Sequence, residues 1–142
     1  MAGSVRPGEP VFVDTGAWIA LALTRDPLHA RARATWEELL GAGVRFQTSV
    51  PVVLETFTFL DRNAARKVAL AWKDSLKTVA HLRVLPSTVK DLDAAWTHFD
   101  RPDLHKLSAV DALSFVLMTE RRIRIAFAFD SHFAAAGFRM VG

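Results

Sequence analysis

Short, strongly apolar segments alternate along this chain with longer segments whose apolar residues recur at helical spacing. The short segments suit buried strands, and they cover residues 11–13, 44–46, 82–85, 123–129 and 138–141. Strands that are separated by helices need crossover connections, which favour a parallel sheet with helices on both faces. The alternation therefore predicts an α/β fold around a central parallel sheet of about five strands.

The intervening segments have helical periodicity and recognisable ends. Helices are predicted over residues 17–23, 28–40, 65–79, 92–99 and 131–136, and a nearly all-apolar, buried helix over 108–120. Ser49 is suited to cap a further helix that begins near Pro51, because a proline in the first turn costs no hydrogen bond. The segment Gly41-Ala42-Gly43 follows the second helix and is suited to end it.

Length and composition limit the class of protein. The 142 residues suit one domain, and we expect a flexible N-terminus over residues 1–9 followed by a single domain over residues 10–142. The chain has no cysteine, which fits a reducing compartment. The N-terminus has no apolar stretch of signal-peptide length, and no apolar run approaches the roughly 20 residues of a membrane-spanning helix. A soluble cytoplasmic protein is therefore expected. The formal net charge of +3 permits a polyanionic partner.

Four carboxylates lie where apolar segments end or are interrupted: Asp14, Glu55, Asp111 and Asp130. Burying an unpaired carboxylate costs several kcal/mol, so something must offset that cost. Asp14 and Asp130 follow strands, and ligands of parallel sheets bind beyond the carboxyl ends of strands. Glu55 and Asp111 would reach the same rim from flanking helices. Oxygen ligands without cysteines or paired histidines suit Mg2+ or Mn2+, so we predict one acidic metal site.

Each carboxylate also has a simpler explanation. Asp14 and Asp130 could be helix N-caps, and Glu55 could face solvent from an amphipathic helix. Asp111 is the hardest to explain in this way, because apolar residues surround it in a helix predicted to be buried. Four such positions are less probable as separate accidents than as one site.

Other chemistries fit the sequence less well. The phosphate-binding motifs GxxxxGK[ST] and GxGxxG are absent. Asp14-Thr15-Gly16 lacks a second acidic residue two positions on, which weighs against a haloacid-dehalogenase-like phosphatase. Ser131 and His132 beside Asp130 do not predict a hydrolytic triad, because triads join distant segments and no GxSxG elbow is present.

Three segments together resemble the PIN-domain ribonucleases, and most of all the VapC-type toxins of bacterial toxin-antitoxin modules. They are VFVDTGAWIAL, VLETFTFL and LSAVDALSFVLMTERRIRIAFAFDSHFAAAGFRMV, and the resemblance extends from about Val11 to Val141. It implies a PIN-like α/β/α sandwich. It also implies that the four carboxylates are the catalytic, metal-binding residues, with the hydroxyls of Thr15 and Ser108 beside them.

The resemblance further implies cleavage of RNA by metal-activated water, leaving a 5′-phosphate and a 3′-hydroxyl. Partners would be the RNA substrate, a VapB-like antitoxin and a second copy of the chain in a homodimer. We expect an antitoxin segment to lie over the carboxyl-end rim and to offer a cationic side chain to the acidic cluster in place of the metal. The helices around Trp18, Trp36 and Phe57 would supply a groove for its apolar face. Residues 100–106 depart from the family pattern, so Asp103 stays outside the core site as an extra ligand or water anchor to be tested.

Basic residues must attract RNA to a site that is acidic without its metal. The candidates are Arg25, Arg62, Arg66, Lys67, Lys73, Arg121 and Arg122. An alternative hypothesis is a catalytically weak PIN-like module that binds RNA or protein and keeps the acidic cluster for structure. The complete set of four carboxylates favours the enzyme, because a binding module gains nothing from charges that it must neutralise.

Overall fold

Five parallel strands form the centre of the computed structural model, which describes residues 5–142. The strands are β1 (Pro10–Val13), β2 (Arg45–Ser49), β3 (Arg83–Leu85), β4 (Ile125–Phe127) and β5 (Arg139–Val141). Their order in the sheet is β3-β2-β1-β4-β5. The central strands are almost wholly buried, as expected for a parallel sheet that helices cover on both faces.

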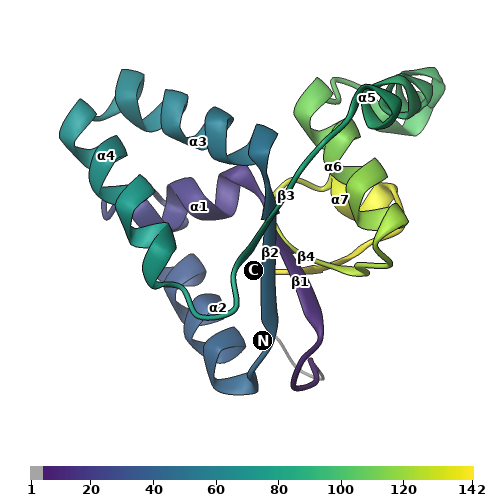
Figure 1. The fold of residues 1–142 in the computed structure, drawn as a ribbon. Helices are drawn as coiled ribbons and strands as arrows, with labels where there is room; N and C mark the ends of the chain where they lie inside the picture. The colour runs from purple at the N-terminus through teal and green to yellow at the C-terminus, as the bar shows by residue number, and fades with distance from the viewer. Residues whose placement is uncertain (1–4) are drawn as a thin grey trace.

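Helices form a layer on each face of this sheet (Figure 1). One layer holds α1 (Thr15–Ala22), α2 (His29–Ala42), α3 (Val50–Asn63) and α4 (Arg66–Ser75). The other holds α5 (Val89–Ala95), α6 (Ala109–Glu120) and α7 (His132–Ala135). Short 3-10 helices cover Leu76–Thr78, Trp96–Asp100 and Pro102–Leu104. The predicted α/β/α sandwich with five parallel strands is confirmed.

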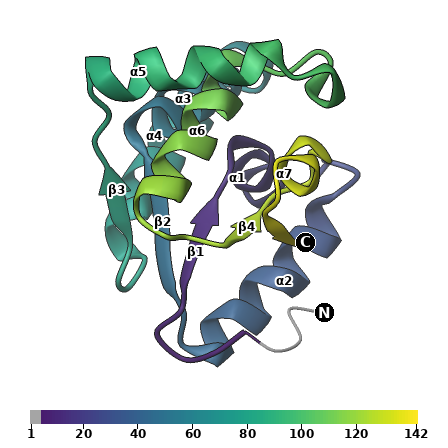
Figure 2. The ribbon, with the colours of Figure 1, turned by 90° about the vertical axis from the view of Figure 1, so that its right-hand side faces the viewer.

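The chain changes direction across the sheet at β1. It proceeds from β1 to β2 and β3, then returns to place β4 on the other side of β1. The carboxyl ends of β1 and β4 are neighbours, with Val13 paired to Phe127. In Figure 2 the β1 arrow points to the end of the sheet where α1 begins. Such a switch point opens a crevice at the carboxyl ends of the strands, and ligands bind there in open α/β sheets.

Capping residues set the starts of the two helices that carry predicted site residues. Ser49 Oγ accepts a hydrogen bond from the Val52 amide at 3.2 Å and caps α3. Ser108 Oγ accepts from the Asp111 amide at 3.0 Å and caps α6. Gly43 ends α2 with a φ of 71°, a conformation that glycine adopts without steric cost.

Several element boundaries differ from the prediction. β2 continues to Ser49, because its residues after Phe46 are polar but still buried between β1 and β3. β4 is shorter than residues 123–129, because the Ile123 amide bonds back to Met118 O at 2.8 Å and ends α6. The apolar stripes over residues 65–79 and 92–99 each finish as a 3-10 helix rather than an α-helix.

Residues 5–9 lie in the segment predicted to be flexible, and they contact the folded domain. The Gly8 amide donates to Gly43 O at 2.8 Å, and Arg45 Nε donates to Gly8 O at 2.7 Å. Val5 joins the hydrophobic core. The first four residues of that segment lie outside the described residues. Within residues 5–142, no helix is long and apolar enough to cross a membrane.

Candidate metal centre

Asp14 lies at the carboxyl end of β1, beside the switch point. Its amide donates to Phe127 O at 3.0 Å, so the backbone continues the pairing of β1 with β4. Asp14 is at the N-cap position of α1, yet its side chain makes no capping hydrogen bond. The carboxylate is 4% exposed, and its Oδ1 is buried without a hydrogen-bond partner among residues 5–142. Its side chain therefore makes no capping hydrogen bond, although the amides of Thr15 and Gly16 act on the carboxylate and lower its pKa.

Asp111 projects from the first turn of α6, which is buried along most of its length. Its side chain is 6% exposed. One carboxylate oxygen of Asp111, one of Asp130 and a ring nitrogen of His132 all lie within 4.8 Å of one another. Two acidic residues 19 positions apart in the sequence are thus brought together by the packing of α6 against the segment after β4.

Asp130 follows β4 and has two roles in the geometry. Its Oδ1 accepts a hydrogen bond from the His132 amide at 2.9 Å, so the capping explanation holds for this oxygen. Its side chain is 41% exposed and open toward Asp111. Sequence reasoning missed the neighbouring His132, although its position two residues after a strand-ending aspartate is a signal for a shared site.

Glu55 lies on α3, outside the group of Asp111, Asp130 and His132 whose potential ligand atoms lie within 4.8 Å of one another. It is half-buried and lines a hollow between α3 and α6 together with Leu54, Arg62 and Val110. The negative charge of Glu55 raises the pKa of both Asp14 and Asp111. The hypothesis that Glu55 simply faces solvent therefore does not account for its position, since its charge acts on the buried carboxylates.

The electrostatics join the four carboxylates into one cluster. Burial is the largest cause that raises the pKa of Asp14 to about 7. The charges of Glu55 and Asp130 contribute to this rise, and the amides of Thr15 and Gly16 oppose it. Burial is also the largest cause that raises the pKa of Asp111 to about 8, with contributions from the charges of the other three carboxylates. Without a metal, ionising Asp14 and Asp111 therefore costs more free energy in the folded protein than in the unfolded chain.

A divalent cation fits these residues. The donors are carboxylate oxygens, and Asp14 Oδ1 is an orphaned buried acceptor that a cation would satisfy. Thr15 Oγ1 is also buried and unpartnered among residues 5–142. The Ser108 hydroxyl caps α6 through the Asp111 amide, which orients that residue. Asp103 instead forms a two-pronged pair with Arg101, at 3.0 and 2.6 Å, and lies outside the cluster.

The predicted basic residues have different surroundings. Arg62 lines the same hollow as Glu55. Arg66 pairs with Asp61 at 2.8 Å, and Lys73 pairs with Asp74 at 2.9 Å. Of these three residues, Arg62 is the one that lines a hollow together with a predicted site residue, Glu55.

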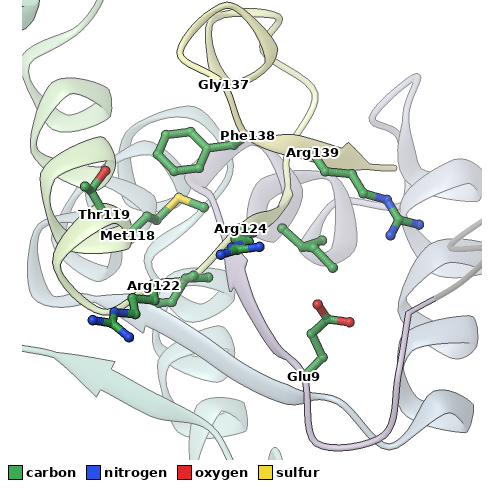
Figure 3. Close-up of a pocket in the computed structure, with 10 residues that line it drawn as sticks. Glu9, Met118, Thr119, Arg122, Arg124, Gly137, Phe138 and Arg139 are labelled. Atoms are coloured by element: carbon green, nitrogen blue, oxygen red, sulfur yellow. The ribbon is translucent and has the colours of Figure 1, made fainter.

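Arg122 belongs to a separate basic hollow of about 690 Å3. Arg124, which immediately precedes β4, and Arg139, which opens β5, line it as well, with Glu9 opposite them (Figure 3). These residues lie at the amino ends of the strands, whereas the carboxylates lie beyond the carboxyl ends. The hollow is therefore distinct from the acidic cluster.

We expect the metal-free protein to lose stability as the pH rises. The folded pKa values of Asp14 and Asp111 lie above the usual 3.8, so their contribution is complete below about pH 4 and is lost as the pH rises through about 7 and 8. At about 1.36 kcal/mol per pKa unit, the coupled pair accounts for several kcal/mol of unfolding free energy. Urea unfolding in chelator at about pH 5 and about pH 8 measures this loss. A double Asp14→Asn, Asp111→Asn variant should flatten the profile, and equal slopes for both proteins would contradict the assignment.

Residues 11–139 match the PIN domain model, and this chain belongs to the PIN-domain family. Among its relatives is the 23S rRNA-specific endonuclease VapC20 of Mycobacterium tuberculosis, found in the strains CDC 1551 and H37Rv. The two proteins are 35% identical over 128 residues, which is 90% of this chain and 95% of the relative. The predicted resemblance to VapC-type members is thereby confirmed.

Solved structures agree with this assignment. The crystal structure of M. tuberculosis VapC20, described as a sarcin-ricin loop cleaving toxin, matches with a TM-score of 0.80 and 34% identity, covering 90% of this chain and 95% of that one. FitAcB from Neisseria gonorrhoeae matches with a TM-score of 0.62 over 93% of this chain and 96% of its own. That second match is 16% identical and concerns the fold alone.

Proposed function

We propose that this chain is a divalent-metal-dependent endoribonuclease that acts as the toxin of a toxin-antitoxin pair. One observation carries the proposal: Asp14 and Asp111 are buried carboxylates at the switch point of a PIN-domain fold, and Asp14 Oδ1 has no partner among residues 5–142. The 35% identity to an rRNA-specific endonuclease supports the same conclusion.

The carboxylates have distinct tasks in this proposal. Asp14, Asp111 and Asp130 hold the metal, and Glu55 completes the negative field from the more open side of the cluster. A bound divalent ion supplies the charge that polarises a phosphodiester oxygen and lowers the pKa of an attacking water. Mg2+ and Mn2+ suit an oxygen-rich site, and both occur in the cytoplasm where we place the protein.

The alternative of a catalytically weak binding module has a physical disadvantage. Burial raises the pKa of Asp14 and Asp111 toward neutrality, so an unmetallated cluster weakens the fold near physiological pH. Replacing such carboxylates with amides or apolar residues would cost a binding module nothing. Their presence is therefore best explained by chemistry that needs their charge.

RNA would reach the cluster along the hollow between α3 and α6. Arg62 and Asn63 line this hollow together with Glu55, and Phe59 adds an aromatic side chain that is 39% exposed. An arginine next to the carboxylates offsets their repulsion of phosphate. Because the relative VapC20 is named for cleavage of 23S rRNA, that RNA is the first substrate to test.

The antitoxin would occupy an apolar hollow of about 470 Å3 between α1, α2 and α4. Three tryptophans line it: Trp18 contacts Trp36 and Trp72, with ring centres 5.7 and 6.0 Å apart. Phe57, which the sequence also suggested, does not line this hollow. A hollow of this composition suits the apolar face of an amphipathic helix from a VapB-like partner.

A homodimer is the oligomer that we propose. Large apolar side chains are exposed on α3 and on α5 with its following 3-10 helix, including Leu54 at 62%, Val89 at 74% and Trp96 at 49%. Such side chains suit an interface between copies of the chain.

Sequencing of RNA 5′ ends after induced expression tests the function. The wild type should create new 5′-monophosphate ends at a small number of sites in 23S rRNA or another RNA, and Asp111→Asn should create none. An unchanged set of ends, with the protein folded and abundant, would reject the nuclease and favour the binding module.

A further inference from the structure

His132 lies against the acidic cluster with one ring nitrogen in an unusual position. Its Nδ1 is 2.9 Å from Asp130 Oδ1, and the imidazole side chain is 19% exposed. Nδ1 itself is buried and makes no hydrogen bond within residues 5–142, although the carboxylate oxygen is so near. The two atoms are therefore close without the geometry of a hydrogen bond.

The contact of the other ring nitrogen fixes the tautomer of the neutral imidazole. His132 Nε2 lies 2.7 Å from the carbonyl oxygen of His105. A carbonyl can only accept, so Nε2 must carry a hydrogen and donate it. In the neutral ring the lone pair is then on Nδ1, where it faces Asp130. In that neutral tautomer the two acceptors repel each other, and a metal ion bound beside both would offset the repulsion.

The spacing matches two neighbouring ligands of one ion. Adjacent ligands of an octahedral ion with bonds of about 2.1 Å are about 3 Å apart, close to the 2.9 Å between Nδ1 and Oδ1. One carboxylate oxygen of Asp111 lies within 4.8 Å of a carboxylate oxygen of Asp130 and of a ring nitrogen of His132. The hydrogen bond from Nε2 to a backbone carbonyl is the outer contact that commonly orients a ligating histidine.

We propose that His132 is a nitrogen ligand of the metal and binds it through Nδ1, beside Asp111 and Asp130. A second observation points to the same ion: Asp14 Oδ1 is buried, unpartnered among residues 5–142, and belongs to a carboxylate that interacts with Asp130 and Asp111. The inference rests on the proposed metal-dependent function and deepens it, because an imidazole ligand favours Mn2+ over Mg2+ relative to an all-carboxylate site.

Two substitutions separate ligation from a structural role. In His132→Gln the side-chain amide can replace Nε2 and keep the bond to His105 O, but nothing replaces Nδ1. In His132→Asn the amide lies where Nδ1 was and offers an oxygen, but the bond to His105 O is lost. A ligand role predicts the larger metal defect in His132→Gln, whereas a structural role predicts the larger loss of metal-free melting temperature and metal binding in His132→Asn.

Calorimetric titration of the purified protein with Mn2+ and with Mg2+, alongside the electron paramagnetic resonance of bound Mn2+, gives the readout. We expect His132→Gln to bind Mn2+ about tenfold more weakly, with Mg2+ affinity changed by less than about threefold and the metal-free melting temperature near that of wild type. Wild-type affinities for both ions in His132→Gln would overturn the proposal.

Asp14→Asn distinguishes failure of this inference from failure of the proposed function. If Asp14→Asn loses metal binding while His132→Gln keeps it, His132 is not a ligand and the metal-dependent function stands. If both variants bind metal like the wild type, the acidic cluster is not the metal site and both proposals fall.

Discussion

Asp14→Asn or Asp111→Asn should lower RNA cleavage by about three orders of magnitude while leaving the protein folded. Each change removes a charge that the metal needs, and a loss of about 4 kcal/mol in transition-state stabilisation corresponds to that factor. The same change relieves burial of a carboxylate and repulsion within the cluster. The metal-free variants should therefore be more stable than the wild type by about 1–3 kcal/mol at about pH 8.

Cleavage of a labelled RNA and urea unfolding measure the two effects in the same preparations. Asp93→Asn is the matched control, because Asp93 is an exposed aspartate on α5 outside the cluster, and it should keep wild-type activity. Full activity of both site variants at an unchanged melting temperature would refute their assignment as ligands.

Removal of divalent metal should silence the enzyme altogether. In excess chelator the four carboxylates repel the phosphodiester backbone as well as one another, so neither substrate approach nor activation of water is supported. Adding Mg2+ or Mn2+ should restore cleavage. It should also stabilise the fold, by about 2.7 kcal/mol when the free metal is a hundredfold above its Kd.

Cleavage assays and thermal unfolding with and without metal test this prediction. The double Asp14→Asn, Asp111→Asn variant should show no stabilisation by metal, which separates specific binding from a general salt effect. Undiminished cleavage in excess chelator would exclude a metal-dependent mechanism.

The sequence predicted the fold class and the acidic residues because both depend on local signals. The period of apolar residues distinguishes strands from helices, and capping residues such as Ser49 and Ser108 set helix starts through contacts three residues away. Asp111 is a candidate from sequence because a charge in an apolar helix has to be buried, and burying it costs free energy whatever the helix packs against. These features need no knowledge of distant contacts.

Other features of the site could not be predicted, because contacts between distant segments decide them. Asp103 is tied to Arg101, and Arg101 also donates to Ala135 O at 2.9 Å, 34 residues away. Phe57 is partly buried against the core and does not line the apolar hollow, whereas Trp72 does line it. Helical spacing alone does not say which of several apolar faces meets the sheet.

By itself, the sequence determined that this protein is built from parallel strands and helices, with four carboxylates where apolar segments end or are interrupted, since hydrophobic periodicity and the cost of buried charge act locally. Only the tertiary structure decided that β4 lies beside β1, which brings Asp130 close to Asp14, and that His105 O orients the His132 ring toward Asp130. Strand order and side-chain orientation depend on hydrogen bonds and packing between segments far apart in the chain, and no local pattern encodes them.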